Sequence, residues 1–274
     1  MFARSNREYK RILGIALGGG RGKNTVVTCL DLTGDRPKVV MVSPRDEDGR
    51  VWYDNVLSKF VMDSPRTTLL ALDAPLTLPA CIRCKERICT GVLECTDPAV
   101  KWFVRNAVGE KSFPRKRFGR KPEFTPYTQR VCEKFLEKQY DIKVREGLGS
   151  SIGPITARAQ HLLRRWSPDY VLHRNLLEVN PKVTISLAFG TSIALDYRRG
   201  PETWETRASI LEQVGGWVDF VVWREMILQS RRRFKSLICA ITAFLWLKHG
   251  WDYPEGMSEI GEEDGWIWAP MDGL

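Results

Sequence analysis

Three consecutive β-rich runs at the start of the chain restrict its fold more than any other feature. The runs are RILGIALG (11–18), TVVTCLDL (25–32) and KVVMVS (38–43), and they are separated by a glycine-rich turn and by TGDRP. Connections this short join antiparallel strands, whereas parallel strands need a long crossover. The sequence therefore predicts a three-stranded antiparallel meander.

Further strands then alternate with helical segments. TLLALDAP (68–75) is a mostly apolar run that predicts a central strand ending at Asp73, and RNLLEVNP (174–181) predicts a fifth strand that carries Glu178. Helices are expected over 151–166, over 181–189 and through much of 217–249, and GWIWAP (265–270) predicts a late strand. This order predicts an α/β fold in which a mixed sheet, the meander plus parallel strands, is flanked by helices.

Residues 76–150 interrupt this alternation and are interpreted as an insertion. The insertion holds a cysteine cluster, a basic arm and a predicted helix over 125–140 with Thr125 as N-cap and Pro126 as first helical residue. The predicted core then comprises 1–75 and 151–274, and core and insertion are expected to form a single compact unit.

The charge of the chain favours an anionic partner. Its formal net charge is +9 and its pI about 9.3, and much of the excess lies in the arm over 111–124. Interleaved basic and aromatic residues are typical of nucleic-acid contacts, although a solvated loop would have the same composition. DNA or RNA is the expected partner, bound in the arm by Arg115, Lys116, Arg117, Arg120 and Lys121.

Four cysteines in the insertion have the spacing of a metal site. Cys81, Cys84, Cys89 and Cys95 form C-x2-C-x4-C-x5-C, which meets the ligand count for Zn²⁺ or an iron–sulfur cluster. Zinc is preferred because nothing else in the sequence indicates redox chemistry, and four buried free thiols are the alternative. The other cysteines, Cys29, Cys132 and Cys239, lie in apolar contexts and are expected in the core.

Targeting signals are not evident. The first ten residues contain no apolar run, and the longest apolar stretch, 237–247, is too short to cross a bilayer. A cytoplasmic protein without a membrane partner is therefore expected, and its cysteines should be thiols or metal ligands.

Candidate catalytic groups are acids at strand ends. Asp73 and Glu178 could together bridge divalent metal ions that activate water for attack on a phosphodiester, although each alone is more often a loop or capping acid.

Several motifs in fixed order resemble a known family. They are LALDAPLTLP, the cysteine cluster with DPAVKW, TPYTQRVCE, GPITARA, LLEVNP, LICAITAF and DGWIWAP, and they span Leu13 to Pro270. The chain resembles the domain of unknown function 429 family, a predicted nuclease group of ribonuclease-H-like fold. The resemblance implies that fold and a Mg²⁺ or Mn²⁺ site made by four acids.

Two of the four implied acids are missing. Asp73 and Glu178 match the pattern, but Ala16 and Lys235 stand where it implies aspartates. A lysine close to a metal opposes binding by several kcal/mol, so Lys235 could instead pair with Asp73 or Glu178. The two substitutions fit either a natural pseudo-nuclease or an enzyme inactivated on purpose.

The motifs also contain arginines suited to phosphate. Arg130 and Arg158 could clamp a phosphate bidentately, or they could cap helices or pair with Glu133, and Arg83 and Lys182 carry the same ambiguity. Three functions follow: a metal-dependent nuclease with an incomplete site, an inactive nucleic-acid-binding or scaffold protein, and an actin-like or sugar-kinase-like ATPase. The ATPase would need a second copy of the core, which the sequence does not show.

Overall fold

The chain forms one six-stranded mixed sheet, here described from a computed structural model over residues 9–19, 24–107, 124–198 and 203–271. The strand order is β3-β2-β1-β4-β5-β6. The strands are β1 (Arg11–Ala16), β2 (Val26–Asp31), β3 (Lys38–Ser43), β4 (Thr68–Leu72), β5 (Leu176–Val179) and β6 (Ile267–Trp268). Strands β1 to β3 pair antiparallel, whereas β1, β4, β5 and β6 run parallel. The predicted meander, later strands and mixed sheet are confirmed.

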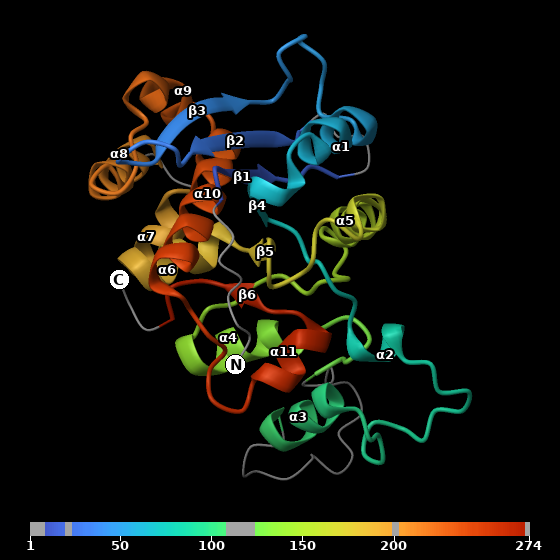
Figure 1. Cartoon of the computed structure of the whole chain (residues 1–274). Coiled ribbons are helices and arrows are strands. Elements are labelled where there is room, and N and C mark those ends of the chain that lie inside the picture. Colours follow the sequence, from blue (N-terminus) through green and yellow to red (C-terminus); the bar gives the residue numbers. More distant parts are fainter. Residues whose placement is uncertain (1–8, 20–23, 108–123, 199–202, 272–274) are drawn as a thin grey trace.

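Helices cover both faces of the sheet (Figure 1). Helices α1 and α5 contact each other on one face, and α10 runs along β1 and β2 on the other. The helices are α1 (Asp54–Met62), α2 (Ala80–Arg83), α3 (Pro98–Ala107), α4 (Val131–Tyr140), α5 (Gly153–Trp166), α6 (Pro181–Phe189), α7 (Thr191–Asp196), α8 (Thr203–Val214), α9 (Arg224–Leu228), α10 (Arg231–His249) and α11 (Ser258–Asp264), with 3-10 turns at Pro65–Thr67 and Val221–Trp223.

Alternation of side chains along the strands builds a separate core on each face. Ile12 and Ala71 belong to the core under α10, while Leu13 and Leu72 belong to the core under α1 and α5. Helix α10 lies so close to β1 that a Cβ atom at Gly14 would collide with the backbone of α10. The sheet and α10 are thereby held in a fixed relation.

The insertion contributes to the main core, although its predicted helix was placed wrongly. Helix α4 begins at Val131, not at Pro126, and its apolar residues join the core under α10. The Thr125 hydroxyl and amide bond Thr128 and Gln129 in a tight turn. The Glu133 carboxylate accepts the Arg130 N–H at 3.1 Å, so that Arg130 is the N-cap.

Other expectations from the sequence have mixed outcomes. Cys29, Cys132 and Cys239 are buried as expected. The basic arm, with all five of its candidate nucleic-acid contacts, lies outside the described residues. Within the described ranges, no helix is long and apolar enough to cross a membrane.

Candidate functional site: a cationic pocket at the carboxyl edge of the parallel strands

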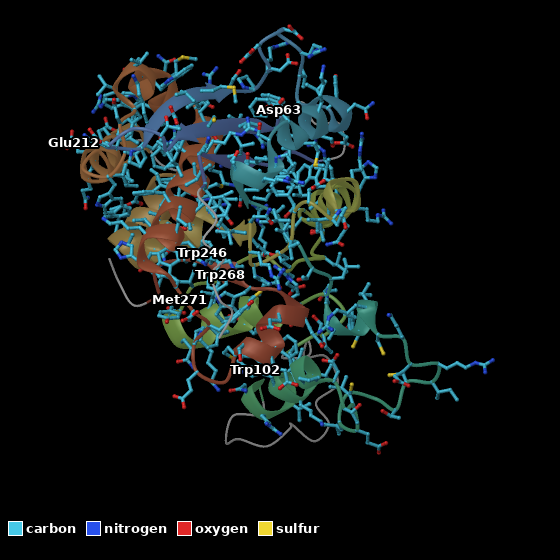
Figure 2. All side chains as sticks on the ribbon, in the orientation of Figure 1. Asp63, Trp102, Glu212, Trp246, Trp268 and Met271 are labelled. Carbon is cyan, nitrogen blue, oxygen red and sulfur yellow. The ribbon has the colours of Figure 1, made fainter. Side chains whose placement is uncertain are left out.

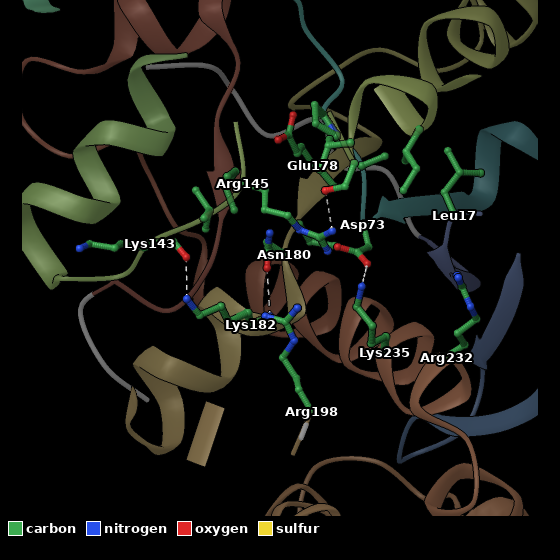
Figure 3. A pocket seen from close by; sticks show the side chains of 18 of the residues that line it. Leu17, Asp73, Lys143, Arg145, Glu178, Asn180, Lys182, Arg198, Arg232 and Lys235 are labelled. Atoms are coloured by element: carbon green, nitrogen blue, oxygen red, sulfur yellow. Dashed lines mark hydrogen bonds and ion pairs between the residues drawn. The ribbon is translucent and has the colours of Figure 1, made fainter. Parts of the chain in front are cut away.

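A pocket of about 270 Å³ lies where β4 and β5 end. Its walls come from the residues after β4, the loop before α5, the first residues of α6, the end of α7 and the first turns of α10. Eight arginines and lysines but only two carboxylates line it, a formal charge of +6. The basic residues are Arg130, Lys143, Arg145, Lys182, Arg198, Arg231, Arg232 and Lys235, and the acids are Asp73 and Glu178 (Figure 3).

The Glu178 carboxylate is held by protein donors on both of its oxygens. Arg130 donates from Nη1 to Oε2 at 2.7 Å and from Nη2 to Oε1 at 2.6 Å, and the Leu76 N–H adds a bond of 2.7 Å to Oε2. Glu178 is 2% exposed and Arg130 1%. A bidentate guanidinium in this environment is a strong, geometrically specific partner. The Glu178 charge is thus neutralised within the protein.

Asp73 is neutralised by a different cation. The Lys235 ammonium, which comes from the second turn of α10, donates to Asp73 Oδ2. This pair is less buried than the first, with side-chain exposures of 24% for Lys235 and 14% for Asp73. Ala16, at the end of β1, is buried and offers no oxygen. The pairing of Lys235 with Asp73 is one of the two that the sequence left open.

The strand register places the side chains of Asp73 and Glu178 on opposite faces of the sheet. Glu178 lies opposite Leu72, and Asp73 is one residue beyond it. Successive side chains of a strand point to opposite faces of the sheet. Glu178 therefore lies on the same face as Leu72, and Asp73 lies on the face covered by α10. Both reach the pocket, but each meets a different part of its wall (Figure 3).

These residues do not fit a divalent metal. Mg²⁺ and Mn²⁺ need several free oxygen ligands, whereas both pocket carboxylates already bind cations and the two positions that would complete the set are Ala16 and Lys235. Over the described ranges, no three Cys, His, Asp or Glu side chains lie close enough to hold a metal ion.

The remaining cations of the pocket crowd one another. Burial lowers the pKa of Lys182, and the nearby positive charge of Arg198 lowers it further. Burial likewise lowers the pKa of Arg232, with Arg231 adding to the effect. Like charges at short range destabilise one another. Binding of an anion would therefore lower the free energy of this wall of the pocket.

Helix α10 adds to this imbalance through its first turn. Arg231, Arg232 and Arg233 follow the N-cap Ser230, and no acid stands in the turn. The N-terminus of a helix is its positive end and ordinarily favours acidic side chains. Three arginines there are the opposite arrangement, which an anion bound beside the turn would relieve.

The two arginines predicted to clamp phosphate are engaged with the protein. All three guanidinium nitrogens of Arg130 donate, to Glu133, Thr77 and Glu178. Arg158 bonds Asp54 at 2.7 Å and also donates to the Gly18 and Trp52 carbonyls and to the Thr25 hydroxyl. Arg130 and Lys182, which the sequence left ambiguous, line the pocket, whereas Arg158 lies outside its lining.

Sequence reasoning missed most of the cationic wall. Arg198, Arg231 and Arg232 were not singled out. The sequence Ser-Arg-Arg-Arg at the start of a long helix could have indicated an anion site, because it places positive side chains at the positive end of the helix dipole. Lys143 and Arg145 precede α5 in an irregular segment, and their position at the pocket depends on tertiary packing.

The four clustered cysteines lie apart from this pocket, in α2 and the segment that follows it. Cys81, Cys84 and Cys89 are exposed and Cys95 is half-buried.

The fold and the pocket together define an α/β protein with a strongly cationic site at the carboxyl edge of its parallel strands. In comparisons with known proteins, the chain matches no family model, and neither a curated protein sequence nor a solved structure is significantly similar to it.

Proposed function

We propose that this chain is a nucleic-acid-binding protein that takes the phosphate backbone into its cationic pocket without a divalent metal. The observation that carries the proposal is the charge of the pocket: both carboxylates are paired with cations, yet a formal +6 remains on its lining. Phosphate contacts by arginine and lysine supply most of the affinity of proteins for nucleic acids.

Arg198 and Arg231 are the groups best placed to meet a phosphate directly. Neither is fully buried, both line the pocket, and they come from the ends of different helices. Lys182 lies between the loop before α5 and Arg198, and its ammonium donates to the Lys143 carbonyl at 2.5 Å (Figure 3). A phosphate oxygen between these groups would accept charge-assisted hydrogen bonds.

The proposal includes a ribonuclease-H-like arrangement of the sheet, as the resemblance to the domain of unknown function 429 family implies. Its support is the antiparallel β1-β2-β3 meander, the parallel strands added beside β1, and the two acids at the carboxyl edge. In this arrangement Lys235 and Arg130 supply the positive charge that metal ions would supply in a nuclease.

A metal-dependent nuclease is the second candidate, favoured by the position of Asp73 and Glu178 at the ends of adjacent parallel strands. Asp73 and Glu178 would hold the divalent ions of such an enzyme, which would supply activation of water for hydrolysis of a phosphodiester. Catalysis by this chain would require Lys235 and Arg130 to release the carboxylates, so we place binding first.

The test is fluorescence anisotropy with labelled single-stranded and duplex DNA and RNA over a range of salt concentrations. The variant Arg198→Glu/Arg231→Glu should bind at least about tenfold more weakly, since one charged hydrogen bond contributes about 1.5–3 kcal/mol. The slope of log K against log salt should become shallower by about 0.7–0.9 for each phosphate that the variant no longer neutralises.

The matched control is Lys10→Glu/Arg66→Glu. Both residues are exposed and lie at the amino ends of β1 and β4, the opposite edge of the sheet from the pocket. This control changes the net charge equally and should leave affinity within about threefold, because exposed charges beyond a Debye length of about 10 Å are screened. Equal losses in the two double variants would reduce the effect to net charge and contradict a pocket.

A further inference from the structure

We infer that Cys81, Cys84, Cys89 and Cys95 together bind one Zn²⁺ ion, as a structural site independent of the cationic pocket. All four are free thiols within fifteen residues of sequence. Four thiolates satisfy the tetrahedral coordination of a closed structural zinc site.

The fold already brings the two ends of this cysteine segment together. Arg83, next to Cys84, forms an ion pair of 3.8 Å with Asp97, which lies two residues after Cys95. The Cys81 N–H donates to the Pro126 carbonyl at 3.1 Å, which fixes the first cysteine against the body of the protein. The first and last thiols are therefore anchored on one side of the segment.

In this structure the four thiols are not close enough together to hold an ion, but the chain between the two anchors is able to fold around one. Between α2 and α3 it holds no helix or strand, so Cys89 can move toward the others without breaking a backbone ladder. The Glu86 N–H donates to Cys84 Sγ at 3.4 Å, an interaction that favours a thiolate.

Val92 and Cys95 pack against the main core, but most of the segment is exposed. Ile88 is 81% exposed and Leu93 68%, and Figure 2 shows the chain after α2 running away from the sheet with few side chains around it. Exposed apolar residues and three exposed thiols do not stabilise a loop, whereas metal binding supplies folding free energy to such a segment.

The zinc site would support the rest of the molecule through Arg83. Its guanidinium contacts Asp264 Oδ1 at 3.3 Å, and Asp264 Oδ2 accepts the Val131 N–H at the start of α4. Zinc would thus brace α11 and α4 from outside.

The first experiment measures the metal content of the full chain purified without chelator, followed by replacement with Co²⁺. We expect one zinc per chain, and a cobalt form with a sulfur-to-metal charge-transfer band and the visible bands of tetrahedral cobalt. Cys84→Ser/Cys89→Ser should lose both signals, while the matched control Cys29→Ser, on β2, should keep them.

A second measurement uses the unmodified protein, in case the double variant does not fold. Thiol titration of the native chain should find the four cluster cysteines protected, and a chelator should expose all four. A wild-type chain without zinc, with no cobalt band and with its surface thiols freely reactive, would overturn the site. Iron and acid-labile sulfide in place of zinc would overturn the assignment of the metal.

Discussion

Two groups of charges meet at the same edge of the sheet, and they are treated in opposite ways. On the α4 side, Arg130 is 1% exposed and its guanidinium binds two carboxylates, Glu133 and Glu178. On the α10 side, Arg198 and Arg231 face the pocket among other cations. The buried group is completed by the protein, whereas we propose that a ligand completes the open group. A cluster of charged residues therefore indicates a binding site only where its partners are missing.

The largest effect is expected from breaking the buried group. Arg130→Met should lower the free energy of unfolding by about 3–5 kcal/mol, because it leaves carboxylates buried without a cation. Urea denaturation at neutral pH measures this loss. The loss should shrink at pH 5, where Glu133 takes up a proton.

The buried group should also impose a pH dependence on stability. Burial raises the pKa of Glu133 to about 7 from an ordinary value of 4.5, and the nearby charge of Glu178 adds to this, although Arg130 opposes it. Between these values the folded chain holds a proton that the unfolded chain has released, so stability falls as pH rises. This contribution is fully present below about 4.5 and is lost above about 7, a change of about 3 kcal/mol.

Comparison with Glu133→Gln isolates this contribution. The difference in unfolding free energy between the wild type and the variant should decline by about 2.4 kcal/mol from pH 5 to pH 7.5. Taking the difference also cancels the opposite slope from His173, whose pKa burial lowers to about 4. A difference that stays constant with pH would show that Glu133 is ionised throughout. It would contradict the raised pKa of Glu133 in the buried group.

Loss of the ion pair between Lys235 and Asp73, on the side of the open group, should have a small effect on stability. Lys235→Met should lower stability by about 1 kcal/mol, near the upper limit for partly exposed pairs. Asp73 then keeps the nearby positive charge of Arg232, whose pKa it raises in return. Thermal and urea unfolding measure the effect. A loss as large as that of Arg130→Met would mean that the two groups do not differ as described.

The smallest effect is expected from divalent ions. Millimolar Mg²⁺ or Mn²⁺ should leave the Tm of the wild type unchanged, because both pocket carboxylates are already paired. Ala16→Asp/Lys235→Asp should instead gain at least about 2 °C with Mn²⁺, the shift that about 1 kcal/mol produces in a chain of this size. Cleavage of labelled DNA or RNA by the wild type with either ion would favour the nuclease.

The sheet could be predicted from the sequence because its strands are local patterns. The runs that contain β1, β2 and β3 are separated by turn residues, and the apolar strand before Asp73 is central as expected. The start of α4 was wrong because Glu133 reaches back to the Arg130 N–H, a contact that outweighs the N-cap preference of Thr125. Helices α3, α7, α8 and α11 were not predicted, and their packing depends on distant parts of the chain.

The site was predicted in its acids and in three of its cations, Arg130, Lys182 and Lys235. Asp73 and Glu178 do line one pocket, and the pairing of Lys235 with Asp73 could be anticipated from the missing aspartates. The bidentate bond from Arg130 to Glu178 joins residues 48 positions apart. No local pattern encodes such a contact, and its effect is to remove Glu178 from the set of free ligands.

The central claim is that the open cations of the pocket bind the phosphate backbone without metal. The most direct measurement is the salt dependence of single-stranded nucleic-acid binding in the presence of EDTA, for the wild type and for Arg198→Glu/Arg231→Glu. The account predicts that the wild type binds in EDTA, and that the variant binds more weakly with a salt slope shallower by about 1.5 units, as expected when two phosphates are no longer neutralised. Binding that needs Mg²⁺, or a variant with unchanged slope, would contradict it.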